Sequence, residues 1–123
     1  MAHKRAVNYP RRGEVYLVNF DPMIGAEIRK TRPALILQND IANRHSPLTI
    51  VSAITSQFEE PLYPTEVLLK AGEGGTSKDS VILLNQIRSV DKRRLVRRLV
   101  TLSPESMQRV HRSLQICLGL VTI

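Results

Sequence analysis

The strongest strand signal in this sequence is the run Ser80-Val81-Ile82-Leu83-Leu84-Asn85-Gln86-Ile87-Arg88-Ser89-Val90. Its aliphatic and β-branched residues favour extended backbone. Because side chains alternate between the two faces of a strand, four of them are expected to share one face: Ile82, Leu84, Gln86 and Arg88. That face is apolar at one end and polar at the other, which is typical of a core strand that reaches a binding surface.

Shorter strands are predicted on the N-terminal side of this run. Stretches rich in β-forming residues cover positions 14–20, 34–37, 48–54 and 65–69. A short turn of helix is expected to begin at Asn39-Asp40. The connection over residues 20–32 is long for a compact domain, and loops of this kind tend to carry function.

A C-terminal amphipathic helix is predicted to begin at Ser103-Pro104-Glu105, which provides an N-cap hydroxyl, a first-turn proline and an early carboxylate. Apolar residues then recur mostly three or four positions apart, at Met107, Val110, Leu114, Cys117, Leu118 and Val121. We expect Cys117 and His111 to pack this helix rather than do chemistry. The order of elements predicts a mainly β fold, a small antiparallel barrel or curled sheet closed by the helix.

The length of 123 residues allows one domain, and we divide the chain into a flexible arm, residues 1–10, and a domain, residues 11–123. The longest apolar runs are far shorter than a membrane span, and the basic N-terminus lacks the apolar core of a signal peptide, so a cytoplasmic location is expected. A single cysteine excludes an internal disulfide framework and a multi-cysteine zinc site. The net charge of +7 favours a nucleic acid or an acidic protein segment as partner, although it is also compatible with a simple solubilising surface.

Conventional catalytic patterns are absent from the sequence. The three histidines are scattered, there is no Walker loop, and no cluster has metal-ligand spacing, so neither a cofactor nor a metal is expected. The remaining polar residue types suit cleavage of RNA, in which the substrate supplies its own 2′-hydroxyl nucleophile. Arg32 ends the long loop and is fixed by Pro33, so it is a candidate to stabilise phosphorane charge, with a surface ion pair to Glu27 as the alternative.

Several motifs occur in a specific order and spacing. They are Arg12-Gly13-Glu14-Val15-Tyr16, Phe20-Asp21-Pro22, Ile24-Gly25-Ala26-Glu27, Lys30-Thr31-Arg32-Pro33-Ala34-Leu35-Ile36-Leu37-Gln38-Asn39-Asp40, Val51-Ser52-Ala53-Ile54-Thr55, and the segment 79–95. Together with the closing helix they resemble the MazF/PemK family of toxin endoribonucleases, in particular the MazF type of Gram-positive bacteria. Only the first dozen residues lie outside the resemblance.

The resemblance implies a partly open barrel of the CcdB/PemK type, similar to a Src-homology-three barrel, and a homodimer. It also implies the toxin of a type II toxin–antitoxin system that cleaves single-stranded RNA, including mRNA, at short sequences without a metal. The expected products are 2′,3′-cyclic phosphate and 5′-hydroxyl ends, and the expected inhibitor is an acidic MazE-like antitoxin. Contact with DNA is expected only indirectly, through the antitoxin.

The resemblance also assigns site residues. Arg32 and Thr55 match the catalytic pair. Glu27 matches a third functional residue, for which two roles stay open: it positions the loop or Arg32, or it is a simple loop anchor. Gln86 is a candidate base reader, and the other expected RNA contacts are Arg88, Ser56, Asn39, Lys30 and Thr31. Some relatives carry an acid where this chain has Asn85. The basic cluster at 92–94 either holds phosphates or is solvated charge.

Two other functions compete with the ribonuclease. A CcdB-like toxin on the same fold would bind and poison DNA gyrase without cutting anything, but it would not need the pair Arg32 and Thr55. A plain RNA-binding barrel is disfavoured by the aromatic content of 4% and the lack of tryptophan, because stacking platforms need several rings.

Overall fold

The computed structural model describes residues 9–20 and 31–122. Most of the arm predicted over residues 1–10 lies outside these ranges. At its end, Pro10 is buried, and the guanidinium of Arg11 lies 4.7 Å from the centre of the Tyr9 ring. In the described ranges, no helix is long and apolar enough to cross a membrane.

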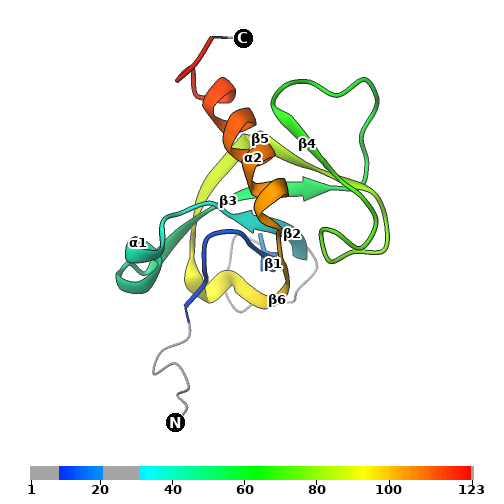
Figure 1. Cartoon of the computed structure of the whole chain (residues 1–123). Helices are drawn as coiled ribbons and strands as arrows, with labels where there is room; N and C mark the ends of the chain where they lie inside the picture. The colour runs from blue at the N-terminus through cyan, green and yellow to red at the C-terminus, as the bar shows by residue number, and fades with distance from the viewer. Residues whose placement is uncertain (1–8, 21–30, 123) are drawn as a thin grey trace.

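One antiparallel sheet organises the described part of the chain, with strand order β4-β5-β3-β2-β1-β6 (Figure 1). The strands are β1 (Glu14–Asn19), β2 (Thr31–Ile36), β3 (Leu48–Thr55), β4 (Glu66–Leu69), β5 (Ser80–Asp91) and β6 (Leu95–Thr101). The helical elements are α1 (Asp40–His45), the 3₁₀ turn η1 (Lys92–Arg94) and α2 (Pro104–Cys117). The predicted mainly β class with a C-terminal helix is confirmed.

Both helices begin where their capping residues predict. The side chain of Asn39 accepts a 2.9 Å hydrogen bond from the N–H of Ala42 at the start of α1. The hydroxyl of Ser103 accepts one from the N–H of Ser106, 3.1 Å away, at the start of α2. These bonds satisfy N–H groups that have no partner inside a helix, so local sequence is sufficient to set both starts.

The end of α2 comes earlier than the apolar spacing predicts. The helix stops at Cys117, and Gly119 follows with φ +74°, a conformation that favours glycine. Leu118 and Val121 are 56% and 39% exposed, so the predicted continuation of the buried stripe to Val121 is wrong. The other apolar positions of the stripe pack against the sheet.

Apolar side chains form a core on each face of the sheet. The larger core lies under α2 and includes Val15, Leu35, Ile54, Leu69, Ile82, Leu84 and Val110. The smaller core, on the other face, consists of Val18, Ala34, Ile36, Val51 and Val90, with Tyr16, Phe20 and Leu95 packed against it. Figure 1 shows α2 lying across β4 and β5, whereas α1 contacts the start of β3.

The pairing of β3 with β5 is irregular. Ser52 lies opposite Ile87, but Ile54, only two residues further along β3, lies opposite Ile82. The extra residues on β5 interrupt its alternation, so Ile82 and Ile87 pack on the same core despite their odd separation.

This irregularity overturns the face assigned to β5 from alternation. Ile82 and Leu84 belong to the core under α2. Arg88 lies opposite Val51, which belongs to the smaller core on the other face. The four residues therefore do not share one face, and the polar end of β5 is directed away from α2.

Strand β6 is absent from the sequence-based prediction. Its sequence Leu95-Val96-Arg97-Arg98-Leu99-Val100-Thr101 has no clean alternation, and no residue in it is fully buried. It pairs only with β1, at the edge of the sheet, where arginines discourage pairing with another strand. An edge strand buries too little to show a clear period-two pattern.

The packing prediction for α2 is confirmed for Cys117 and wrong for His111. The thiol of Cys117 donates to the carbonyl oxygen of Leu84 at 3.1 Å, and its side chain contacts the larger core. His111 is exposed, because the stripe turns away from it.

The loop between β4 and β5 is tied to α2 through Glu73. Its carboxylate accepts hydrogen bonds from the Ser106 hydroxyl and from Arg109, 3.0 Å away. The Ser106 bond, with further help from the Lys70 N–H and Arg109, outweighs burial and holds the pKa of Glu73 below its ordinary value of 4.5. The lowered pKa means that the ionised carboxylate stabilises the fold.

We therefore expect Glu73→Gln to lower the free energy of unfolding at neutral pH by about 1–2 kcal/mol. A depressed carboxyl pKa contributes stability above the unfolded-state value and loses it as pH falls through the folded-state value. The deficit of the variant should thus shrink below pH 4.5. Urea unfolding at neutral and acidic pH measures it, with the exposed Glu59→Gln as control; a deficit that is independent of pH would contradict the role of the charge.

Candidate functional site

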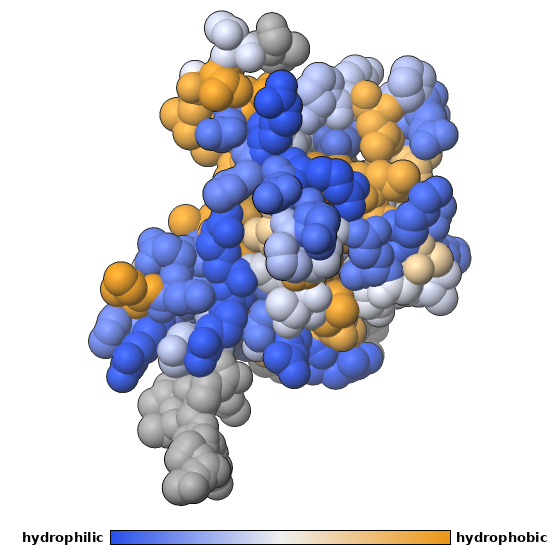
Figure 2. All heavy atoms as spheres, in the orientation of Figure 1, coloured by the Kyte–Doolittle hydropathy of each residue, from blue (hydrophilic) through white to orange (hydrophobic). Residues whose placement is uncertain are grey.

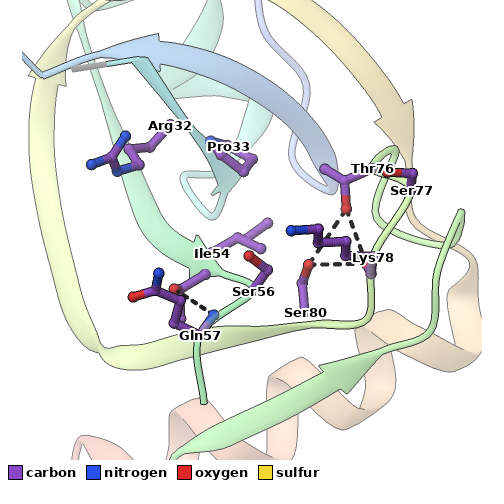
Figure 3. A pocket seen from close by; sticks show the side chains of 10 residues that line it. Arg32, Pro33, Ile54, Ser56, Gln57, Thr76, Ser77, Lys78 and Ser80 are labelled. Carbon is purple, nitrogen blue, oxygen red and sulfur yellow. Dashed lines mark hydrogen bonds between the residues drawn. The ribbon is translucent and has the colours of Figure 1, made fainter. Parts of the chain in front are cut away.

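Two pockets adjoin at the ends of β2 and β3. The first has a volume of about 410 Å³ and is lined by Arg32, Pro33, Ile54, Thr55, Ser56, Gln57, Thr76, Ser77, Lys78 and Ser80 (Figure 3). The second has a volume of about 520 Å³ and is lined by Phe20, Arg32, Ala53, Ile54, Thr55, Gln57, Leu83, Gln86, Ile87 and Arg88. Because Arg32 and Thr55 line both, the pockets form one groove, which we divide into a Lys78 limb and a Gln86 limb.

The register of β2 and β3 brings Arg32 level with Thr55. Ala34 lies opposite Ala53, and two further residues along each strand lead to the arginine and the threonine. Both side chains consequently lie on the face opposite α2, at the junction of the two limbs. This proximity cannot be predicted from the positions of the two residues in the sequence, because only the pairing of β2 with β3 brings them together.

The two side chains at the junction offer donors to a ligand. Arg32 is exposed, and within residues 9–20 and 31–122 its guanidinium makes a long contact of 3.5 Å to the Thr31 carbonyl oxygen. The Thr55 oxygen accepts from the N–H of Gln57 at 3.1 Å, which orients the hydroxyl and leaves its proton available to donate (Figure 3). A guanidinium beside a hydroxyl donor suits the non-bridging and leaving oxygens of a phosphodiester.

The Gln86 limb combines an aromatic ring with hydrogen-bonding groups. The guanidinium of Arg88 lies over the Phe20 ring, 5.0 Å from its centre. Gln86 is exposed next to them and offers both a donor and an acceptor. The irregularity in β5 aims these residues at the groove, so this limb can bind a base through hydrogen bonds to its edge.

The Lys78 limb is rich in hydroxyl groups. Ser56 follows β3, whereas Thr76, Ser77, Lys78 and Ser80 come from the loop before β5 and the first residue of β5. Figure 3 shows the Lys78 side chain and the Arg32 side chain at different sides of the pocket. This limb therefore offers a second cation across from the arginine.

Five residues predicted for the site are brought together in the groove: Arg32, Thr55, Ser56, Gln86 and Arg88. Two others lie elsewhere. Asn39 caps α1, and the hydroxyl of Thr31 is buried without a hydrogen-bond partner among the described residues; neither lines a limb of the groove. Glu27 and Lys30 lie outside the described residues.

The basic cluster at 92–94 is tied into the fold. The Lys92 ammonium donates to the carbonyl oxygens of Asn43 and Ser46, at 2.5 and 2.8 Å. Arg93 forms an ion pair with Asp91 at 3.0 Å and, through its side-chain hydrogen bond, lowers the pKa of Asp91 to about 2. These contacts differ from the freely solvated charge considered from the sequence.

Sequence reasoning missed Phe20, Gln57 and Lys78 as groove residues. Phe20 ends the first predicted strand, and its position before Asp21-Pro22 was the available signal. No neighbouring residue in the sequence indicates that Lys78 lines the groove, because its loop reaches the groove only when β5 pairs with β3. Across the described residues, no group of three or more His, Cys, Asp or Glu side chains is placed to hold a metal ion.

The fold and the groove define a small basic β domain with an arginine and a threonine at the junction of its groove. A family model described as "PemK-like, MazF-like toxin of type II toxin-antitoxin system" matches residues 11–118. The chain belongs to this family, as the motifs in its sequence indicate.

Relatives and solved structures agree with this assignment. Endoribonuclease EndoA of Bacillus subtilis (strain 168) is 46% identical over 111 residues, which cover 90% of this chain and 96% of that protein. Endoribonuclease MazF of Staphylococcus saprophyticus is 45% identical over 113 residues, 92% of this chain and 94% of that protein. A MazE–MazF crystal structure from Deinococcus radiodurans has a TM-score of 0.73 at 29% identity and covers 92% of this chain and 98% of that chain. These matches confirm the expected barrel type and do not favour a CcdB-like gyrase poison.

Proposed function

We propose that this protein is the toxin of a type II toxin–antitoxin pair and cleaves single-stranded RNA, including mRNA, at short specific sequences. The observation that carries the proposal is the presence of Arg32 and Thr55 at the junction of the groove in a chain of this family. Relatives at 45–46% identity are named endoribonucleases, which supports the same activity here.

The proposed chemistry uses the substrate's own nucleophile. The 2′-hydroxyl loses its proton to water and attacks the adjacent phosphorus, a pentacovalent phosphorane forms, and the bond from phosphorus to the 5′-oxygen breaks, so that a 2′,3′-cyclic phosphate and a 5′-hydroxyl result. Arg32 stabilises the charge on the phosphoryl oxygens and delivers to the leaving oxygen a proton that it regains from solvent, because a guanidinium holds its proton too tightly to act as the general base. Thr55 donates a hydrogen bond from its hydroxyl to an oxygen of the scissile phosphate.

The remaining residues of the groove position the RNA in this proposal. Gln86 forms hydrogen bonds with the edge of a base. Arg88 packs on the Phe20 ring and binds the RNA backbone, and Ser56 binds the RNA beside the cleavage site. Glu27 is proposed to position Arg32 or its loop, and Lys30 to contact RNA. No step requires a metal ion.

Assembly and location complete the proposal. We propose a homodimer acting in the cytoplasm. Leu118, Leu120 and Val121 are 56%, 70% and 39% exposed at the end of α2, a surface that pairing can bury. The space-filling view shows apolar atoms gathered over this end of the helix within a largely hydrophilic surface (Figure 2).

The function is tested by incubating the purified protein with a long single-stranded RNA and mapping the product ends. We expect cuts at a recurring short sequence, with 2′,3′-cyclic phosphate and 5′-hydroxyl ends, and the same cuts in EDTA. Products with 5′-phosphates would contradict the chemistry. Intact RNA together with inhibition of DNA gyrase would instead support a CcdB-like poison.

The toxin requires an inhibitor, and we propose an acidic, initially disordered antitoxin segment that occupies the same groove. Solved MazE–MazF complexes of relatives support a partner of this kind. Coupled folding lets such a segment cover a wide charged surface, and salt should slow its association.

We expect the C-terminal peptide of the cognate antitoxin to displace RNA from the protein. The measurement is a titration of the peptide in the presence of an uncleavable RNA, with a scrambled peptide of the same composition and charge as control. Simultaneous binding without mutual weakening would exclude occupancy of the groove and indicate an allosteric inhibitor.

A further inference from the structure

We infer that Lys78 binds a backbone phosphate of the substrate next to the cut, so that the Lys78 limb anchors the RNA chain while the Gln86 limb reads bases. The inference rests on the proposed function and deepens it. Neither limb alone explains how a short RNA sequence is both recognised and bound.

The position of Lys78 supports a role in binding substrate. Its side chain is exposed, lines the groove with Arg32 and Thr55, and extends into the pocket in Figure 3. Among the described residues, the three recorded ion pairs do not involve it. An ammonium without an acidic partner at the rim of such a groove is available to an anionic ligand.

The backbone that carries Lys78 is held in place. Its carbonyl oxygen accepts hydrogen bonds from the hydroxyls of Thr76 and Ser80, at 3.1 and 3.2 Å. The Asp79 carboxylate accepts from the N–H of Ala71 at 2.8 Å, across the same loop. Because the loop is already ordered, the lysine needs to fix only its own side chain on binding.

The loop that carries Lys78 also packs against the sheet at Gly75. Its φ of +82° is rare for other residues, and an added Cβ would lie 2.8 Å from the Cβ of Leu99 on β6. This close approach fixes the path of the residues just before Lys78. Lys78 is therefore presented by a defined turn.

The side chains of the Lys78 limb suit binding of the RNA backbone, whereas those of the Gln86 limb suit recognition of a base. The residues lining the Lys78 limb include no aromatic ring, but they include several hydroxyls and an ammonium. Arg32, Thr55 and Gln57 line both limbs. The Gln86 limb adds the Gln86 amide and the Arg88 guanidinium, which lies over the Phe20 ring. Hydroxyls and a point charge suit phosphate and sugar, which carry no sequence information, whereas an exposed amide suits the edge of a base.

The test compares Lys78→Gln with Lys70→Gln, a matched change at an exposed lysine that lines neither limb. For Lys78→Gln we expect KM for cleavage and Kd for an uncleavable RNA to rise by about three- to tenfold with kcat nearly unchanged, by a similar factor for cleavable and unrelated sequences. The slope of log affinity against log salt should fall by about 0.7, the value for one phosphate on a single strand. Lys78→Arg should restore most of the affinity.

A neutral methylphosphonate placed at each phosphate around the cut locates the contact. The wild type should lose affinity at one flanking position where Lys78→Gln loses none, since the variant has already lost that contact. Equal behaviour of Lys78→Gln and Lys70→Gln, or an effect limited to particular sequences, would overturn the inference. A wild type that binds RNA but cuts nothing would contradict the proposed function, and the binding comparison would still decide the role of Lys78.

Discussion

Replacing Arg32 with alanine is expected to reduce the rate of RNA cleavage by about a hundredfold or more, and Thr55→Ala by a similar factor. Each change removes from the junction of the groove a side chain that the proposed mechanism uses as a donor to the scissile phosphate. Because Arg32 is exposed and Thr55 half-buried at a strand end, neither loss leaves a cavity in a core. Single-turnover cleavage of a short RNA measures the chemical step, and thermal unfolding checks the fold.

The matched controls are Arg44→Ala and Thr101→Ala, which remove an exposed arginine on α1 and an exposed threonine on β6. Both should cleave like the wild type, as should His45→Ala and His111→Ala. A folded but inactive histidine variant would indicate conventional acid–base catalysis. Near-normal cleavage by Arg32→Ala or Thr55→Ala would remove that residue from the catalytic pair.

The double variant sharpens this prediction. If Arg32 and Thr55 stabilise the same phosphorane, the loss in Arg32→Ala/Thr55→Ala should be much smaller than the product of the two single losses. Multiplicative losses would instead indicate that the two side chains act on separate steps.

A single 2′-deoxy substitution at the cut site is expected to abolish cleavage, because it removes the attacking hydroxyl from the substrate. Binding should be nearly unchanged, since the phosphates and bases remain. The measurement pairs gel analysis of cleavage with the affinity of the same oligonucleotide. The matched control carries the 2′-deoxy sugar two positions away and should still be cut.

EDTA is expected to leave cleavage of the all-ribose substrate intact. Cleavage of the 2′-deoxy substrate would show that the sugar hydroxyl is not the nucleophile, and activity that is lost with EDTA and restored by magnesium would show that a metal ion takes part in the reaction. The two results together separate attack by the sugar from attack by water.

Local sequence was sufficient for most of the architecture. The β-forming runs around Leu35, Val51 and Ile82 became β2, β3 and β5, and the caps Asn39 and Ser103 began the helices. Caps and buried apolar runs act over a few residues, so they can be recognised without knowledge of the fold. β6 was not predicted, because an edge strand with adjacent arginines buries too little to impose a period-two pattern.

The candidate site was only partly determined in this way. Arg32 stood out from its place between a long loop and Pro33, whereas Thr55 and Gln86 were identified through the family motifs. The face of the sheet that Gln86 and Arg88 occupy depends on the irregular pairing of β3 and β5, which alternation could not predict.

The fold class, the basic charge and the catalytic candidates could be predicted without the structure, since each depends on composition, short-range periodicity or a contiguous motif. The proximity of Arg32 to Thr55, of Phe20 to Arg88 and of Lys78 to the same groove arises only when the chain folds. These contacts join segments of the chain that are far apart in sequence. They arise from strand register and loop seating, which only the packing of the whole sheet determines.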